Sequence, residues 1–255
     1  ALGYFVKPVI FGTLAAWMAQ VPRRVAMIEG LGYVFTTSGV ALSWKRKLLR
    51  TTVSWLYRVA LARANRVIFL NRDDISDFVQ AGLVEEGTAD LLGGIGVELG
   101  EWQLAPTVKS PVTFLLAARL LREKGIPEYA AAAKQVKAQY PETRFILLGG
   151  FDPNPGGLSR SEVQGWVSEG LLEWPGHVAV KPWLAQASVY VLPSYREGLP
   201  RSTQEAMAMG RPVITTDAPG CREPHLTGCA GVADRRDRHR SRSWSPRGRG
   251  SGADR

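Results

Sequence analysis

Cysteine is scarce in this sequence, and long apolar runs are absent. Only Cys221 and Cys229 occur among 255 residues, too few for a disulfide framework, and this is typical of a protein from a reducing compartment. The most apolar stretch, residues 9–19, is interrupted by Gly12 and is shorter than the roughly 20 residues that cross a bilayer. No signal-peptide pattern opens the chain. We therefore expect a cytoplasmic protein, with contact to the inner face of the cytoplasmic membrane as an option.

Metal-binding and dinucleotide-binding patterns are lacking as well. No Asp-x-Asp pair occurs, and no G-x-G-x-x-G turn follows a first strand, which argues against a Rossmann-type dehydrogenase. Cys221, His225, Cys229 and His239 match no structural zinc spacing. We therefore expect no bound metal and no cofactor.

Positive charge is concentrated at the end of the chain. The composition, 45% hydrophobic and 22% charged, is that of a globular protein, and the formal net charge is +9. Residues 234–255 hold eight arginines and three aspartates, a net charge of +5, which leaves +4 for residues 1–233. Because this segment has almost no aliphatic residues, we predict a disordered tail over residues 224–255. Its arginines could bind phosphates, but without a folded reader or interleaved aromatics we do not expect a nucleic-acid partner.

Apolar runs alternate with amphipathic stretches along the chain, most regularly in its second half. Predicted strands there lie at residues 112–118, 144–149, 188–192 and 212–215, and predicted helices at 127–140, 159–169 and 199–209. The first half gives predicted strands at 24–29, 66–70 and 91–97, and predicted helices at 43–64 and 71–80. This alternation favours βαβ units and parallel sheets. The proline-containing segment 100–111 marks a boundary, so we predict an α/β fold with two Rossmann-like domains, residues 1–105 and 106–223.

One stretch of the second half combines a strand end, a loop and a helix start. The loop presents Glu197 and Gly198, and the predicted helix begins at Leu199. The carboxyl end of a parallel strand beside a helix N-terminus is where doubly wound folds bind ligands, and the backbone N–H groups there favour a phosphate. Gly198 would let the backbone approach a ligand closely. The carboxylate of Glu197 can accept hydrogen bonds from sugar hydroxyls, and Glu205, about two turns into the helix, can accept them from a ribose.

The sequence around these acids resembles the family-4 glycosyltransferases, which are retaining enzymes of the GT-B fold. Residues 193–214 read PSYREGLPRSTQEAMAMGRPVI, and Glu197 and Glu205 fit the family's E-x7-E motif. The resemblance implies that Glu197 contacts the hydroxyls of the donor sugar and that Glu205 contacts the ribose of the nucleotide. A helix-capping acid followed by a solvent-facing acid is the plainer alternative.

A second match lies in residues 118–125, ARLLREKG, after the first predicted strand of the second domain. It resembles the family's GRL…KG loop, which implies that Arg119 and Lys124 bind the donor diphosphate, although Ala118 stands where glycine is common. Two cations there would stabilise the leaving nucleoside diphosphate as negative charge develops. A solvated charged loop is the alternative.

Weaker resemblances involve three further segments. Gly149, in the LLGG run, matches a strand end beside the nucleotide, and His177 and Val178 match a segment whose backbone contacts the base. Gly30 and Gly32, in EGLGYVF, would lie in the acceptor cleft. An ordinary loop histidine and a tight turn would give the same patterns.

The first half also resembles bacterial members of the family that build lipid-linked glycans in polysaccharide and lipopolysaccharide biosynthesis, through residues 7–16 and 29–35. The implied reaction moves a sugar from a nucleotide-diphosphate donor, a UDP-sugar, to a glycan or polyprenyl-diphosphate-linked acceptor with retention and without metal. The basic helix predicted at 43–64 either docks on anionic lipid with its tryptophans at the interface, or is an ordinary surface helix.

The chain departs from the family at both ends. Family members start with further strands and a glycine-rich loop, so we expect the first domain to be incomplete at its N-terminus. After residue 223 the family continues with a DGVNGFLV-like strand, whereas residues 224–229 read PHLTGC; we therefore expect the second domain to be incomplete at its C-terminus. A reading-frame shift near residue 223, or a truncated fragment, would explain this change. The alternative function is accordingly a catalytically inactive fragment that binds a nucleotide-sugar.

Overall fold

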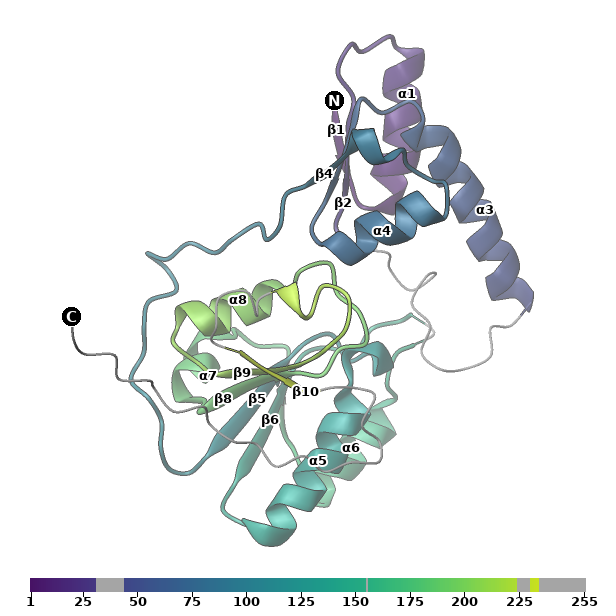
Figure 1. Cartoon of the computed structure of the whole chain (residues 1–255). Coiled ribbons are helices and arrows are strands. Elements are labelled where there is room, and N and C mark those ends of the chain that lie inside the picture. The colour runs from purple at the N-terminus through teal and green to yellow at the C-terminus, as the bar shows by residue number, and fades with distance from the viewer. Residues whose placement is uncertain (31–43, 155, 224–229, 234–255) are drawn as a thin grey trace, which may run out of the picture.

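The structure, a computed structural model, describes residues 1–30, 44–154, 156–223 and 230–233. Two parallel β-sheets divide this part of the chain into a smaller first domain, purple to blue in Figure 1, and a larger second domain, teal to yellow. The architecture confirms the predicted α/β fold class with two Rossmann-like domains.

The first sheet has four parallel strands in the order β1-β2-β3-β4. The strands are β1 (Leu2–Tyr4), β2 (Val25–Ile28), β3 (Arg66–Phe69) and β4 (Ala89–Leu91). The helices are the π-helical turn η1 (Pro8–Gly12), α1 (Thr13–Met18), α3 (Trp44–Leu61), α4 (Arg72–Gln80) and the 3-10 turn η2 (Glu86–Thr88). The strand predicted at 91–97 is therefore wrong in position, because Gly93 and Gly96 adopt positive φ and end the extended run.

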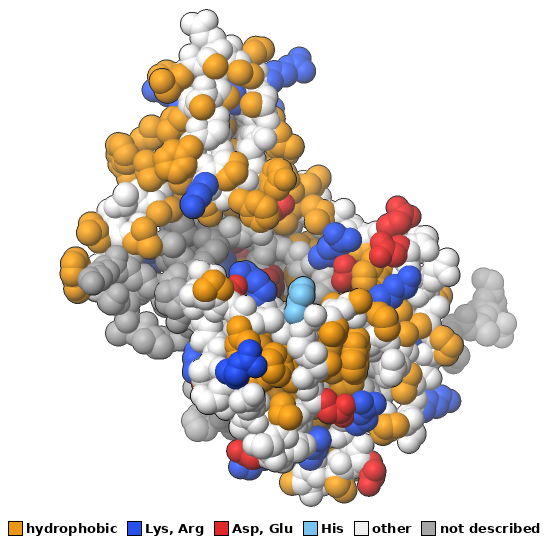
Figure 2. Space-filling model, turned by 180° about the vertical axis from the view of Figure 1, so that it is seen from behind, with side chains coloured by type: hydrophobic (Ala, Val, Ile, Leu, Met, Phe, Trp, Pro, Cys, Tyr) orange, Lys and Arg blue, Asp and Glu red, His pale blue; other side chains and the backbone are white. Residues whose placement is uncertain are grey.

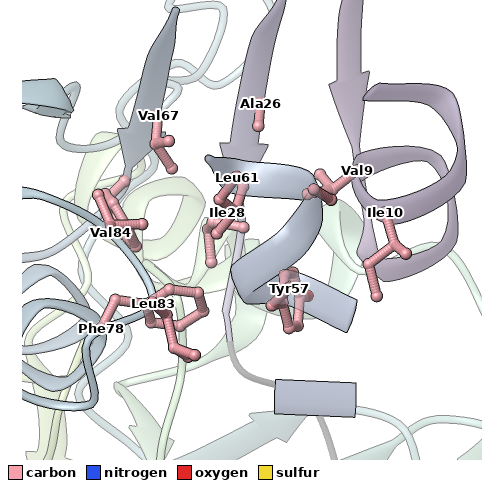
Figure 3. Close-up of a cluster of buried hydrophobic side chains, with 12 residues drawn as sticks. Val9, Ile10, Ala26, Ile28, Tyr57, Leu61, Val67, Phe78, Leu83 and Val84 are labelled. Carbon is pink, nitrogen blue, oxygen red and sulfur yellow. The ribbon is translucent and has the colours of Figure 1, made fainter. Parts of the chain in front are cut away.

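Helix packing on this sheet forms one apolar core (Figure 3). Tyr57 and Leu61 of α3 and Phe78 of α4 are directed at strand residues such as Ile28 and Val67. Phe78 makes edge-to-face contacts with Tyr57 and with Phe69, at centroid distances of 5.5 and 5.2 Å. These contacts fix α4 at the carboxyl end of β3, which matters for the site described below.

The second sheet has six parallel strands in the order β10-β9-β8-β5-β6-β7. The strands are β5 (Thr113–Ala117), β6 (Arg144–Leu148), β7 (Glu173–Gly176), β8 (Val189–Leu192), β9 (Val213–Thr216) and β10 (Ala230–Ala233). The helical elements are the 3-10 turn η3 (Arg122–Lys124), α5 (Ile126–Gln139), α6 (Arg160–Ser168), α7 (Lys181–Gln186) and α8 (Arg201–Ala208).

Helices cover both faces of this sheet (Figure 1). Leu115 and Ala117 of the central strand β5 pack in the core under α7 and α8, whereas Leu116 packs in the core under α5 and α6. This alternation follows from the two-residue side-chain period of a strand. A run that is apolar on both faces is what a central parallel strand requires.

Two parts of the second domain differ from the sequence predictions. The sequence prediction named no helix or strand between the helix at 159–169 and the strand at 188–192, yet β7 and α7 lie there. Both are short and contain a proline, and neither shows an apolar period. We also predicted a disordered tail from residue 224, but Ala230–Ala233 forms β10 and pairs in parallel with β9. The rest of that tail lies outside the described residues.

Candidate functional site

A pocket of about 250 Å³ lies where the two domains meet. Its first-domain wall is mostly apolar, and its second-domain wall is mostly charged. The apolar side chains that line it are Phe5, Val6, Met27, Ile28 and Tyr57. The remaining lining residues are Glu29, Gly30, Arg119, Glu123, Lys124, Arg196, Glu197 and Gly198. The pocket therefore brings together five of the residues singled out from the sequence: Gly30, Arg119, Lys124, Glu197 and Gly198.

Lys124 and Glu197 face each other in this pocket. The Lys124 Nζ donates to both carboxylate oxygens of Glu197, at 2.7 and 2.8 Å. Only 14% and 15% of the two side chains are exposed, so solvent screens the pair less than it screens a surface ion pair. The residues assigned to the diphosphate and to the donor sugar are thus in direct contact.

Close backbone packing brings their two loops together. Gly125, at φ 72°, ends η3, and a Cβ at this position would lie 2.1 Å from the carbonyl oxygen of Pro193. The Tyr195 N–H donates to the Glu123 carbonyl at 2.8 Å. The loop that follows β5 and the loop that follows β8 are therefore joined next to Lys124 and Glu197, at the carboxyl edge of the sheet.

Residues 195–198, which we call the 195–198 loop, are held from several sides. The Glu197 N–H donates to Pro219 O at 3.0 Å, and Gly220, at φ 73°, leaves room for the Glu197 carbonyl. Gly198 presses its backbone against the first domain, because a Cβ there would lie 1.7 Å from Glu29 O. We expected Gly198 to permit close approach of a ligand; in the structure it also permits close approach of the other domain.

Arg119 lies at the rim of the pocket, just after β5. Its Nη1 is 2.6 Å from an Asp152 carboxylate oxygen, and 63% of its side chain is exposed. Burial would raise the pKa of Asp152, but hydrogen bonds from Asn154 and Arg119 outweigh it and lower that pKa. Arg119 can turn toward an anion in the pocket only by giving up its ion pair with Asp152, whose side chain is 7% exposed.

Three predicted nucleotide contacts lie beside the pocket rather than in its lining. Gly149 ends β6 with its backbone against Ala118, where a Cβ would lie 1.8 Å from the carbonyl oxygen. His177 follows β7 and is exposed. The Val178 side chain packs against the core, which leaves its backbone as the part that can contact a ligand.

Leu199 and Glu205 also lie outside the pocket lining. Leu199 is half-buried just before α8. The Glu205 carboxylate pairs with Arg201 at 3.0 Å along α8, and 12% of its side chain is exposed. Burial raises the pKa of Glu205 despite this positive neighbour.

Sequence reasoning missed the contributions of the first domain other than Gly30. Arg196 lines the pocket and bonds to Asp74 of α4, and Asn71 bonds to Gly198 O. The helix-capping pattern at Asn71 was visible in the sequence, but no local signal connects α4 with a loop more than 120 residues later. Gly32, predicted for the acceptor cleft, lies outside the described residues.

The described part of the chain contains no candidate metal site. No group of three or more His, Cys, Asp or Glu side chains there is placed to hold an ion. The expectation of a metal-independent reaction stays a prediction.

Known proteins resemble the chain both in sequence and in fold. It is 30% identical over 228 residues to the N,N'-diacetylbacillosaminyl-diphospho-undecaprenol alpha-1,3-N-acetylgalactosaminyltransferase of Campylobacter jejuni, which covers 84% of this chain and 57% of that protein. It is 25% identical over 237 residues to the UDP-Gal:alpha-D-GlcNAc-diphosphoundecaprenol alpha-1,3-galactosyltransferase of Escherichia coli, covering 84% and 56%. The chain thus spans somewhat more than half the length of these curated relatives.

The solved sucrose-phosphate synthase of Thermosynechococcus elongatus has the same fold. It superposes with a TM-score of 0.69 at 22% identity, over 92% of this chain and 60% of that one. A family model described as "Glycosyl transferases group 1" matches residues 111–238, about half of the chain, including the second sheet and both pocket loops that follow β5 and β8. The chain therefore belongs to the group 1 glycosyl transferases, with the GT-B fold.

Proposed function

We propose that the protein to which this chain belongs transfers a sugar from a UDP-sugar to a polyprenyl-diphosphate-linked glycan, with retention at the anomeric carbon. The observation that carries the proposal is the contact between Lys124 and Glu197 in a pocket shared by both domains. The names of the two relatives, a diphospho-undecaprenol N-acetylgalactosaminyltransferase and a diphosphoundecaprenol galactosyltransferase, support this acceptor class. Retention rests on the family resemblance.

The charged wall suits a nucleotide-diphosphate donor. In the proposed complex, Lys124 and Arg119 bind the diphosphate, whose charge competes with Glu197 and Asp152 for these cations. Glu197, displaced from Lys124, then accepts hydrogen bonds from the sugar hydroxyls. As the bond between the sugar and the phosphate breaks, the two cations stabilise the negative charge on the leaving nucleoside diphosphate.

The apolar wall suits the lipid side of an acceptor. Phe5, Met27 and Ile28 come from the first domain and face the same pocket as the charged residues. A lipid-linked diphosphate sugar has an apolar chain next to charged and hydroxylated groups, so it can contact both walls at once. An acceptor that is entirely hydrophilic would leave this apolar surface in water.

A panel of nucleotides tests the donor proposal. We expect UDP and at least one of UDP-GlcNAc, UDP-GalNAc and UDP-Gal to raise the melting temperature of the purified chain, because a ligand that binds only the folded state stabilises it. We expect GDP-mannose to give a smaller shift, and EDTA to leave all shifts unchanged. If no uridine nucleotide raises the melting temperature, the donor assignment is wrong.

Turnover separates an enzyme from the alternative of a binding-only fragment. The assay combines the stabilising UDP-sugar with a short polyprenyl-diphosphate-linked sugar and measures UDP release and the anomeric configuration of the product. Product with retained configuration supports the proposal. Donor binding without product supports the inactive fragment.

We also propose that the first domain touches an anionic membrane surface through α3. Its exposed apolar side chains include Trp44, Leu48, Leu49 and Trp55. Residues 44–61 contain five Lys or Arg and no acidic residue, and Figure 2 shows hydrophobic side chains gathered over this domain. Among the described residues no helix is long and apolar enough to cross a membrane. Cationic and aromatic side chains on one helix favour the interface of an anionic bilayer, here the inner face of the cytoplasmic membrane.

Vesicle binding tests this contact. We expect the chain to cosediment with phosphatidylcholine vesicles only when phosphatidylglycerol is added. Trp55→Ser should weaken binding at least about tenfold, since burial of one large apolar side chain contributes roughly 1.5–3 kcal/mol. Tyr140→Ser, at an equally exposed aromatic of the second domain, serves as the control. Equal binding by wild type and Trp55→Ser would reject α3 as the contact.

A further inference from the structure

The first turn of α4 reaches across the domain junction to the 195–198 loop. Asn71 caps this helix, and its side-chain oxygen accepts from the Asp74 N–H at 2.7 Å. The amide nitrogen of the same side chain donates to Gly198 O at 2.6 Å and to the Asp74 carboxylate at 3.0 Å. A capping residue of the first domain therefore also binds the backbone on one side of Glu197.

Asp74 binds the residue on the other side of Glu197. Its carboxylate accepts from Arg196 Nε at 3.2 Å and from Arg196 Nη2, and Asp77 accepts from the same Nη2 at 2.5 Å. Asp74 is fully buried, whereas 15% of the Arg196 side chain is exposed. A buried carboxylate is costly unless it is paired and hydrogen-bonded, and here Arg196 and Asn71 supply those partners.

These contacts come from one helical turn and bracket Glu197. Arg196 precedes it, Gly198 follows it, and both are held by residues of α4. A second ion pair crosses the junction from the same turn, between Asp73 and Arg222 at 3.0 Å, but it does not touch the 195–198 loop. Both Asp74–Arg196 and Asp73–Arg222 join the domains, but only Asp74–Arg196 also contacts the residue next to Glu197. Variants of Asp73 and Asp74 can therefore distinguish the joining of the domains from the placement of Glu197.

We propose that Asn71 and Asp74 are positioning residues of the donor site, which hold Glu197 in the orientation that contacts the donor sugar by binding Arg196 and Gly198. This inference rests on the proposed function of Glu197. Neither residue lines the pocket, and each acts on Glu197 through the residue that precedes or follows it. The first domain thereby determines how well the second domain binds the sugar part of its donor.

The ratio of UDP-sugar affinity to UDP affinity measures this role, because UDP lacks the sugar that Glu197 contacts. Calorimetric titration of the whole chain with UDP and with the stabilising UDP-sugar gives the ratio for wild type, Asp74→Asn, Asn71→Ser and Asp73→Asn. Serine keeps the helix cap, but its shorter side chain lacks the amide nitrogen that donates to Gly198 O. Asp73→Asn is the matched control, one residue away on the same turn.

We expect Asp74→Asn and Asn71→Ser to lower the ratio of UDP-sugar affinity to UDP affinity by about tenfold, because a small displacement of Glu197 weakens its contacts with the sugar strongly. The affinity for UDP itself should stay within about twofold of the wild-type value. Asp73→Asn should keep the wild-type ratio. If Asp74→Asn does not fold, Asn71→Ser carries the test. Wild-type ratios in Asn71→Ser and in any folded Asp74→Asn, or an equal fall in Asp73→Asn, would overturn the positioning role.

The outcomes also separate this inference from the proposed function. If wild type binds no UDP-sugar, or Glu197→Gln leaves the ratio unchanged, the role of Glu197 fails and the positioning role fails with it. If Glu197→Gln lowers the ratio but the α4 variants do not, only the positioning role is wrong.

Discussion

Replacing Glu197 by glutamine is expected to lower the affinity for the UDP-sugar by about 100-fold and to lower turnover at least as much. Glutamine keeps one acceptor oxygen, so one hydrogen bond to a charged group, worth roughly 1.5–3 kcal/mol, is lost and a second is weakened by about 1 kcal/mol, which together correspond to about two powers of ten. The affinity for UDP should not fall, because Lys124 then has one anionic competitor fewer. Calorimetry and the turnover assay measure the two effects.

Glu169→Gln is the matched control for this prediction. Glu169 is exposed at the end of α6, in the same domain. We expect wild-type affinities and wild-type turnover from it. An unchanged UDP-sugar affinity in Glu197→Gln would contradict the assignment, as would an equal loss for UDP and UDP-sugar, since the latter would indicate a role in general folding.

Replacing Gly198 by alanine should disrupt the junction of the two domains. The new Cβ would lie 1.7 Å from Glu29 O, a backbone atom, so the 195–198 loop must move away from the first domain. We expect a loss of about 1–3 kcal/mol in unfolding free energy, as for other overpacked sites. Donor affinity should fall as well, because Glu197 moves with the loop. Thermal unfolding and calorimetry measure these effects.

Gly165→Ala provides the contrast. Gly165 lies inside α6, and a Cβ there meets no atom within 4 Å. Alanine should therefore stabilise the helix by up to about 1 kcal/mol and leave donor binding unchanged. If Gly198→Ala is as stable as Gly165→Ala and binds the donor normally, the close contact between the domains is not as the structure describes it.

The charged half of the site could be predicted from sequence because its residues sit on local patterns. Glu197 and Lys124 each follow a buried strand, and parallel strands end at a common edge, so both loops were expected at that edge. The two loops meet because β5 and β8 are paired in the sheet. Gly198 marked a place where a backbone can approach closely, although the sequence could not tell that the other domain approaches there.

The first-domain half of the site depends on contacts between residues far apart in the sequence, and the pattern of a single sequence does not indicate such contacts. The ion pair of Asp74 with Arg196 joins residues 122 positions apart. The local sequence around Asp74 indicates only an acidic residue in the first turn of a helix. The apolar wall escaped prediction for a different reason. Met27 lies in the short strand β2 and Phe5 directly follows β1, and apolar neighbours of both pack in the core of the first domain. Whether these two side chains face a pocket is decided by the placement of the second domain.

A crystal structure of this chain with the UDP-sugar that stabilises it most would test the central claim, that the pocket between the domains is the donor site. The account predicts diphosphate oxygens within hydrogen-bond distance of Lys124 and Arg119, and the Glu197 carboxylate released from Lys124 and bonded to sugar hydroxyls. A nucleotide bound away from this pocket would contradict the account, as would a bound donor beside an intact pair of Lys124 and Glu197.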